Sequence, residues 1–322
     1  MSPARDSVLR RLARWVKALG SVVRHPVAVD QHRRQLEAEN QHLRDLYVGW
    51  VPPGHFYSPF PDLDDYDRRV SNLLDTHRDV VGIDLHESEQ LALAEAIEGL
   101  VADIAFPEQP DPAGATRYWF DNPAYAYGDG TVLHGMLRHL RPRRIVEVGS
   151  GYSSAMILDT VDGWLSGTEL TFIEPHSELV RGLLRPGDEA RVSIHEVAVQ
   201  DVSPEVFDRL EHGDVLFVDS THVVKAGSDV NHLVFEVLPR LQPGVWVHVH
   251  DIFFPFEYPE AWVREGRAWH EAYLVRAFLA FNPTFEIRWF QDFLRCRHRD
   301  RLERIPWVAK NPGANLWLEK VR

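Results

Sequence analysis

The sequence predicts a doubly wound α/β fold, in which helices cover both faces of a mostly parallel sheet. Five short apolar runs rich in Val, Ile or Phe are bounded by turns, and stretches of helical periodicity separate most of them. Strands that alternate with helices in this way form parallel sheets. Two later runs have no helix-length apolar pattern between them, so we expect them to pair antiparallel at one end of the sheet. The seven expected strands are 144–148, 170–174, 192–197, 214–219, 245–250, 285–290 and 315–321.

The composition is that of an ordinary globular protein. Of the 322 residues, 44% are hydrophobic and 26% are charged, and the formal net charge is −13. A strongly acidic chain is a poor general partner for nucleic acid, so we expect a small-molecule substrate. Cys296 is the single cysteine, which excludes an intrachain disulfide and a thiolate zinc site and fits a reducing cytoplasm.

The first 50 residues predict a helical arm. Leu9 to Val23 has apolar residues at helical spacing with arginines and a lysine between them, and Val29 to Leu46 is a second helical stretch. A basic amphipathic helix could lie weakly on an anionic membrane surface. A single helix of this kind is a weak signal, and we favour the alternative that it packs on the body of the protein or on a second subunit, which would make a homo-oligomer. The charges are wrong for a signal peptide, and no run of about 18 apolar residues predicts a membrane span.

Residues 51–117 are interpreted as a lid or helical cap, and residues 118–322 as the main domain. Val51 to Asp65 mixes prolines with aromatic and acidic residues and predicts a loop at the boundary. Asp84 to Ile104 predicts a structural helix, with Ser88 able to cap its start. In the main domain, helices are expected from Asp129, as an N-cap, to Leu140, from Ser153 to Leu165 and from Ser228 to Leu241.

The run from Arg144 to Ser154, RIVEVGSGYSS, predicts a buried strand, a glycine turn and a helix start. Glycines allow close approach of a ligand, and the amides of a helix N-terminus suit a carboxylate or phosphate. Dinucleotide-binding folds use a similar turn, but they favour a third glycine where this chain has Ser154. Glu147 could face the amino group of a methionine moiety, and it would repel a phosphate. Glu174 ends the next strand, where a carboxylate can bind both ribose hydroxyls.

With these motifs the chain resembles the class I S-adenosylmethionine-dependent methyltransferases, nearest to the small-molecule O-methyltransferases of the sugar, macrolide and catechol type. The resemblance runs from about Tyr118 to the C-terminus. It implies a Rossmann-like, seven-stranded methyltransferase fold whose last two strands are antiparallel. It also implies S-adenosylmethionine as cofactor, held by residues of the glycine loop, the strand ends and the adenine edge. These are Glu147, Gly149, Ser150, Gly151, Ser153, Glu174, Gln200, Asp201 and Asp219.

The predicted catalytic residues follow the fourth and fifth strands. Ligands of open parallel sheets gather at the carboxyl ends of the strands, so Asp219 and His250-Asp251 should face one crevice with the glycine loop. His222 is the candidate general base, because imidazole with its usual pKa of about 6.5 is largely neutral in the cytoplasm. The alternative is a histidine that only bonds the cofactor or the loop backbone.

The resemblance also implies a divalent cation such as Mg²⁺. In similar enzymes a metal-binding Asp closes the fourth strand, a base follows three residues later, and a second metal carboxylate falls at Asp251. Ile252 stands where those enzymes often have Asn or Asp. His248 and His250 lie two apart on one strand and hence on one face, so His250 could supply the missing ligand beside Asp219 and Asp251. A core role is the alternative for His248.

The sequence therefore predicts a methyltransferase that acts on a hydroxyl of a small molecule, a sugar or a secondary metabolite, with His222 and Asp219 as catalytic residues. Two alternatives stay open. The acceptor atom could be nitrogen or carbon, with the same cofactor half. The chain could also be a non-catalytic module of this fold that its amphipathic arm recruits to a partner.

Overall fold

The structure is a computed structural model that describes residues 26–47 and 50–322. It divides the chain into two compact units, residues 1–66 and 67–322. The first contains α2 (Pro26–Tyr47), which confirms the second predicted helix, and the start of α3 (Leu63–Leu73), so the predicted loop ends before Asp65. The basic helix expected from Leu9 to Val23 lies outside the described residues. The predicted boundaries after residues 50 and 117 stay predictions.

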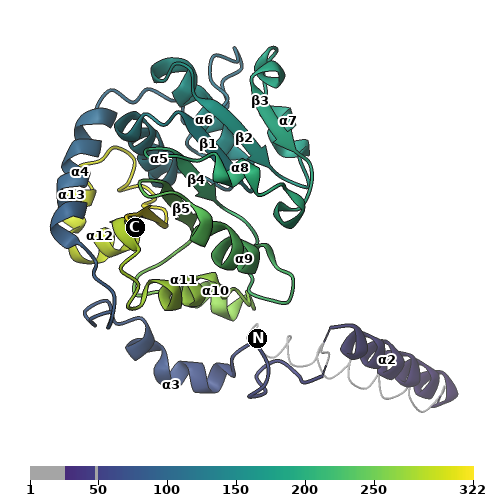
Figure 1. The fold of residues 1–322 in the computed structure, drawn as a ribbon. Helices are drawn as coiled ribbons and strands as arrows, with labels where there is room; N and C mark the ends of the chain where they lie inside the picture. The colour runs from purple at the N-terminus through teal and green to yellow at the C-terminus, as the bar shows by residue number, and fades with distance from the viewer. Residues whose placement is uncertain (1–25, 48–49) are drawn as a thin grey trace, which may run out of the picture. The chain divides into compact units, whose positions relative to one another are not determined.

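The larger unit is built on one seven-stranded sheet, as predicted (Figure 1). Strands β1 to β5 are parallel, and β7 lies antiparallel between β5 and β6, so the strand order is β3-β2-β1-β4-β5-β7-β6. The α/β fold class with an antiparallel C-terminal pair is therefore confirmed. The strands are β1 (Arg144–Val148), β2 (Glu169–Ile173), β3 (Val192–His195), β4 (Val215–Val218), β5 (Trp246–His250), β6 (Phe285–Phe290) and β7 (Asn315–Lys320).

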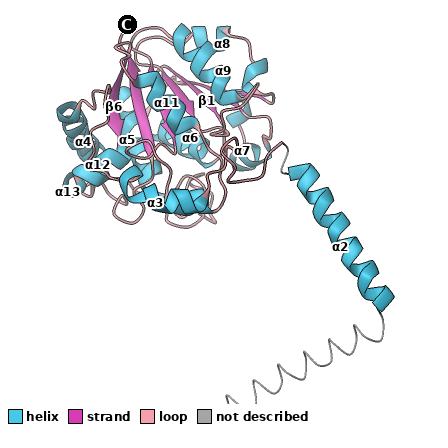
Figure 2. Cartoon of the chain, turned by 90° about the horizontal axis from the view of Figure 1, so that it is seen from below, coloured by secondary structure: helices cyan, strands magenta, loops and turns pink. Residues whose placement is uncertain are grey.

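Helices surround the sheet (Figure 2). On one face α4 (Glu87–Val101), α5 (Tyr127–Leu140) and α6 (Tyr152–Trp164) pack against one another in chain order. On the other face, the π-helix Leu233–Val237, which continues directly from α9 (Asp229–His232), and α11 (Glu271–Leu279) lie over β4, β5 and β7. The shorter helices are α7 (Glu178–Leu183), α8 (Glu205–Asp208), α10 (Glu260–Arg264), α12 (Gln291–Arg297), α13 (Arg299–Leu302) and the 3-10 turns Asp188–Ala190, Val199–Asp201 and Leu238–Arg240.

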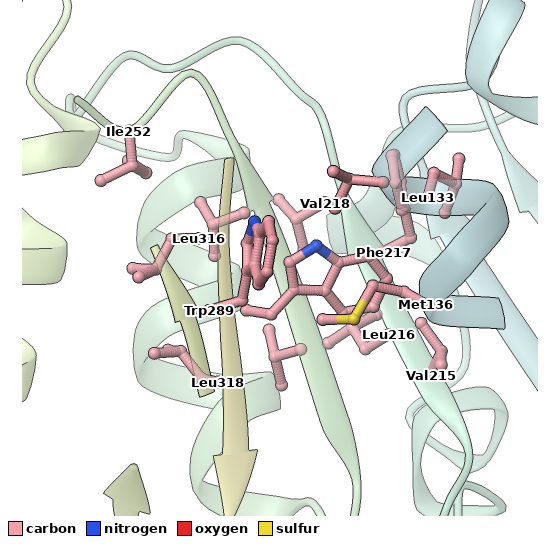
Figure 3. Close-up of a cluster of buried hydrophobic side chains, with 14 of the residues drawn as sticks. Leu133, Met136, Val215, Leu216, Phe217, Val218, Ile252, Trp289, Leu316 and Leu318 are labelled. Carbon is pink, nitrogen blue, oxygen red and sulfur yellow. The ribbon is translucent and has the colours of Figure 1, made fainter. Parts of the chain in front are cut away.

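The core lies on both faces of the central strands. All four residues of β4 are buried, and Figure 3 shows their side chains close to Leu133 and Met136 of α5 and to large side chains of β6 and β7. Burying a side chain of this size contributes roughly 1.5–3 kcal/mol. The continuous apolar run of β4 is typical of a central strand that is covered on both faces.

Four local predictions were wrong. The helix expected from Ser228 to Leu241 is divided into α9, the π-helix and a 3-10 turn, although Ser228 does cap it by accepting from the Asn231 amide at 3.2 Å. Ser88 and Asp129 cap no helix, because α4 begins at Glu87 and α5 begins at Tyr127. Helices α12 and α13 lie between β6 and β7, where we expected none, and both are too short to show an apolar stripe. None of the described helices is both long and apolar enough to cross a membrane.

Candidate active site

The carboxyl ends of the central strands form one level edge. Val148 of β1 pairs with Ile173 of β2 and with Val218 of β4, and Val218 pairs with Val249 of β5. The residues that follow these strands therefore come out at the same edge of the sheet. This brings the glycine loop, Glu174, Asp219 and His250-Asp251 together as the sequence predicted.

Gly149 allows the backbone of the glycine loop to approach the end of β4 closely. Its φ is 85°, a left-handed conformation that favours glycine, and a Cβ there would overlap the carbonyl group of Asp219. Its amide donates to the Ile173 carbonyl at 3.0 Å, and the Asp219 amide donates to the Val148 carbonyl at 2.9 Å. The candidate cofactor loop and the candidate catalytic aspartate are thus held in direct backbone contact.

Glu147 does not face open space, which corrects the expectation that its carboxylate meets the cofactor. The residue is fully buried, and its two oxygens accept from the hydroxyls of Ser153 at 2.6 Å and Ser154 at 2.5 Å. The Ser154 hydroxyl also accepts from the Gly151 amide at 3.0 Å. Burial raises the pKa of Glu147 to about 8, so the group is mostly protonated at neutral pH. Glu147 and both serines therefore shape the loop from behind.

Glu174 lies directly after β2 and is half-buried. One carboxylate oxygen accepts from the Ser150 amide of the glycine loop at 3.2 Å, and the other accepts from the His176 amide at 2.8 Å. Ser150 is buried, and its hydroxyl has no hydrogen-bond partner among the described residues. Both groups therefore stand beside the loop with bonding capacity left for a ligand.

Gln200 and Asp201 lie in the 3-10 turn that follows β3, and both are exposed. The Gln200 side-chain amide donates to the Gly227 carbonyl at 2.8 Å, which ties this turn to the loop after β4. The two residues stand next to β2 in the sheet order, on the glycine-loop side of β4. Their predicted contact with the adenine ring stays a prediction.

His222 is held by the start of α11. Its φ is 59°, an uncommon value for a residue with a side chain, and its carbonyl accepts from the amides of His270 at 2.9 Å and Glu271 at 3.2 Å. Nδ1 of the ring lies 2.8 Å from Oε2 of Glu271, which is itself buried. Strained backbone that is fixed in this way concentrates at functional sites.

The other ring nitrogen of His222 faces two candidate site carboxylates. Nε2 lies 3.5 Å from Oδ1 of Asp219 and 3.9 Å from Oδ2 of Asp251. Burial alone would lower the pKa of His222, but hydrogen bonds to Asp219 and Glu271 outweigh it and raise the pKa to about 10. The expectation of a neutral imidazole in the cofactor-free protein was therefore wrong. The histidine charges also hold the pKa of Asp219 below its usual range, despite burial.

Sequence reasoning missed Glu271. It lies 49 residues after His222, in a stretch where no helix was predicted. The buried positions Ala272, Val275 and Leu279 do show the stripe of α11. An acid at the first position of a helix is common on protein surfaces, because it suits the helix dipole. The sequence therefore carries no signal that this one is buried against a histidine.

A large pocket opens at this edge of the sheet. Its volume is about 920 Å³, and its lining includes Asp129, Asp219, His250, Asp251, Glu257 and Trp262. Asp219 belongs both to this pocket and to the backbone contact with Gly149. The pocket is therefore adjacent to the glycine loop and is the candidate acceptor site.

A buried arginine anchors the segment that forms one wall of the pocket. The side chain of Arg117 is 3% exposed and contacts carboxylates of Asp159 at 2.6 Å and Asp188 at 2.7 Å. Asn122 then bonds the carbonyl of Tyr125 at 2.9 Å. Breaking a buried ion pair costs about 3–5 kcal/mol, so this wall is firmly fixed.

His248 and His250 lie on the same face of β5, as predicted, and both contact the ring of Tyr125. His248 is fully buried, stacks on Trp317 with centroids 4.9 Å apart, and lies 3.3 Å from the Tyr125 hydroxyl, so it is a core residue. His250 lines the pocket. Its Nδ1 is buried and has no hydrogen-bond partner among the described residues.

The residues proposed as metal ligands do not fit a preformed ion site. His250 Nε2 and Asp251 Oδ1 are 3.6 Å apart, and the nearest carboxylate oxygens of Asp219 and Asp251 lie 3.5 Å and 3.9 Å from Nε2 of His222. In residues 26–47 and 50–322, no three His, Cys, Asp or Glu side chains are grouped so that they could hold a metal ion. No step of the reaction is therefore assigned to a metal.

Comparison with known proteins supports one family. The sequence model of a family described as a methyltransferase domain matches residues 146–252, from β1 to the residue after Asp251. A protein of Archaeoglobus fulgidus, described as uncharacterized, is 35% identical over 173 residues, which cover 52% of this chain and 77% of the relative.

Similar solved structures include an O-methyltransferase from Bacillus cereus in complex with S-adenosylhomocysteine. It has a TM-score of 0.39 and 15% identity, with 80% of this chain and 97% of the other covered. Another is the O-methyltransferase TomG from Streptomyces achromogenes in complex with S-adenosylmethionine. It has a TM-score of 0.41 and 17% identity, with 80% and 96% covered.

The sheet with its antiparallel last strands, the glycine loop between β1 and α6, and the family match over the same residues agree with one another. Residues 146–252 therefore form a methyltransferase domain, and the chain has the fold of the class I S-adenosylmethionine-dependent methyltransferases.

Proposed function

We propose that the protein transfers a methyl group from S-adenosylmethionine to a hydroxyl of a small molecule, with His222 as general base. One observation carries this proposal. The ring of His222 is fixed by Glu271 at Nδ1, while Nε2 faces Asp219 and Asp251, which line the pocket beside the glycine loop. A nucleophile-activating base that a third group orients is the arrangement that such a step needs.

The bound cofactor supplies a sulfonium methyl group as the electrophile. His222 takes the proton of the acceptor hydroxyl at Nε2, while the hydrogen bond of Nδ1 to Glu271 keeps the ring in place and stabilises the imidazolium. Asp219 connects the two halves, because its backbone touches Gly149 and its side chain lines the pocket. Alignment contributes on the order of 7–11 kcal/mol to such a step, more than proton transfer does.

The histidine must lose its proton before it can act as a base. In the cofactor-free protein its pKa is raised to about 10, mainly because carboxylates of Asp219 and Glu271 outweigh burial. A cationic cofactor beside Asp219 opposes a second positive charge on the ring, so we expect its binding to lower the pKa of His222. Cofactor binding would thereby prepare the base.

The pocket lining favours a polar acceptor with an apolar face. The lining combines three carboxylates with two aromatic rings. The carboxylates are those of Asp129, Asp251 and Glu257, and the rings are those of Phe253 and Trp262. Carboxylates accept hydrogen bonds from hydroxyls, and aromatic faces pack on rings. We therefore propose a sugar or a hydroxylated secondary metabolite as the acceptor class.

The test uses the full chain and its His222→Ala variant. Calorimetric titration with S-adenosylhomocysteine measures cofactor binding, and transfer of labelled methyl from S-adenosylmethionine to a set of sugars and phenols measures turnover. We expect the variant to keep its affinity within about threefold and to lose about 10²–10⁴-fold in kcat. Turnover equal to wild type would eliminate His222 as the base, and failure of the wild-type chain to bind the cofactor product would eliminate the function.

A further inference from the structure

Asp129 is a buried carboxylate with one oxygen in use. It lies in the first turn of α5, is 6% exposed and lines the pocket. Its Oδ1 accepts from the Ala314 amide at 3.1 Å and from the side-chain amide of Asn315 at 2.8 Å. No donor in residues 26–47 and 50–322 reaches Oδ2. A buried carboxylate is normally fully hydrogen-bonded, so one oxygen is left for something outside the chain.

The loop before β7 is built around this carboxylate. Gly313 has a φ of 71°, and a Cβ at this position would overlap the carboxyl group of Asp129. The Ala314 carbonyl accepts from the Asp251 amide at 2.7 Å. Ala314 thus holds the side chain of Asp129 on one side and the backbone of Asp251 on the other. A single residue therefore fixes the carboxylate of Asp129 relative to the backbone of Asp251.

His250 provides a second, independent indication of a ligand. It is 5% exposed, lines the same pocket, and its Nδ1 has no hydrogen-bond partner among the described residues. Buried polar atoms without a partner are rare in native proteins and concentrate where a structure serves a function. Asn315, which donates to Asp129, also has a buried side-chain oxygen with no hydrogen-bond partner among the described residues.

We propose that Asp129 binds a second polar group of the acceptor, a hydrogen-bond donor beside the hydroxyl that is methylated. This inference rests on the proposed function. The donor is a hydroxyl or an ammonium group, so the acceptor is a polyol or an amino alcohol rather than an isolated alcohol.

An anionic acceptor does not suit the lining. Asp129, Asp219, Asp251 and Glu257 would repel a carboxylate or phosphate. Both arginines of the pocket already have acidic partners, since Arg295 contacts Asp292 at 2.5 Å and Arg267 contacts Glu265 at 2.9 Å. The pocket therefore selects for donors and against negative charge.

The test compares wild type with Asp129→Asn in the full chain saturated with S-adenosylhomocysteine. Asparagine keeps an oxygen for Ala314 and Asn315 and loses the charge. Calorimetry measures binding of methyl glucoside, which offers several hydroxyls, methyl glucosaminide, which adds an ammonium group, and cyclohexanol, which has one hydroxyl. We expect the substitution to weaken at least one sugar about tenfold or more and to leave cyclohexanol unchanged, because a hydrogen bond to a charged group is lost.

Comparing the two sugars shows which group of the acceptor donates the hydrogen bond to Asp129. Equal losses identify a hydroxyl, and a larger loss for the glucosaminide identifies an ammonium group. Asp300→Asn, in an exposed part of α13, is the matched control for the change of charge. Asp129→Ala replaces the asparagine variant if thermal melting shows that the latter is unfolded.

Either of two results would overturn the inference. One is that neither sugar binds wild type more tightly than cyclohexanol does. The other is that the Asp129 variants bind both sugars as the Asp300 variant does. Normal binding of S-adenosylhomocysteine in those experiments would leave the proposed function intact, whereas its absence in wild type would mean that the proposed function had failed.

Discussion

The two ends of the candidate site are held together in different ways. At the cofactor end, from Arg144 to Glu174, the bonds to Glu147 span six and seven residues, and the bond from Ser150 to Glu174 spans 24. At the acceptor end, the bond from His222 to Glu271 spans 49 residues and the bond from Asn315 to Asp129 spans 186. The cofactor end is thus one continuous segment, while the acceptor end is assembled from several separate parts of the chain. We expect substitutions at the first to act on folding and cofactor binding, and those at the second to act on turnover and acceptor choice.

The largest expected effect is that of Gly149→Ala. The new methyl group would overlap the Asp219 carbonyl at a left-handed φ, so both strand ends would have to move. We expect the free energy of unfolding to fall by about 3 kcal/mol and affinity for S-adenosylhomocysteine to fall with it. Denaturant titration and calorimetry measure the two quantities.

Gly163→Ala is the control for that substitution. Gly163 lies in α6, and a Cβ there meets nothing within 4 Å, so the change should leave stability equal or raise it by about 0.5–1 kcal/mol. A Gly149→Ala protein as stable as the control would show that the two ends of the site are not in contact through this backbone.

Glu271→Gln should have an intermediate effect, confined to turnover. The Glu271 carboxylate is one of two that raise the pKa of His222 to about 10, so its removal lowers that pKa. The base must be neutral to act, and in wild type kcat/KM for S-adenosylmethionine, which reports the cofactor-free enzyme, should rise with pH up to about that pKa. In the variant the rise should shift to lower pH by roughly one unit, with a plateau about tenfold lower because the ring is no longer held.

A lower rate without any shift of the pH profile would mean that Glu271 only supports the fold. The matched control is Glu257→Gln, which alters another carboxylate of the pocket, one bonded to the Tyr273 hydroxyl at 3.0 Å. The Glu257→Gln substitution should leave the pH dependence of kcat/KM unchanged. Thermal melting of both variants checks that they remain folded.

The smallest expected effect is that of Glu147→Gln. Glu147 is fully buried, bonded to two serine hydroxyls and mostly protonated at neutral pH, so a neutral glutamine should serve nearly as well. Affinity for S-adenosylhomocysteine should stay within about threefold of wild type. A loss of more than tenfold would instead show a direct charged contact with the amino group of the cofactor, which is worth about 1.5–3 kcal/mol.

The same difference between the two ends explains what the sequence could predict. All seven strands were located within about two residues, because their apolar runs are contiguous. Four site residues could also be placed at one edge of the sheet, because the carboxyl ends of parallel strands lie at the same edge. They are Gly149, Asp219, His222 and Asp251. These predictions need only local patterns and one rule of topology.

What could not be predicted depends on burial and on distant partners. Glu147 looks like a ligand-facing acid in the sequence, but only the packing of α6 shows that Ser153 and Ser154 occupy both its oxygens. The protonation of His222 depends on Glu271, and the role proposed for Asp129 depends on Gly313 and Ala314. No periodicity in a single chain links such residues.

The position of β7 between β5 and β6 affects the order in which the protein can mature. During synthesis, β1 to β5 and the glycine loop leave the ribosome well before β7, and the nucleotide-binding half can become compact early. The loop that encloses Asp129 and fixes Asp251 is made immediately before β7. A nascent chain should therefore acquire cofactor affinity before it acquires acceptor selectivity.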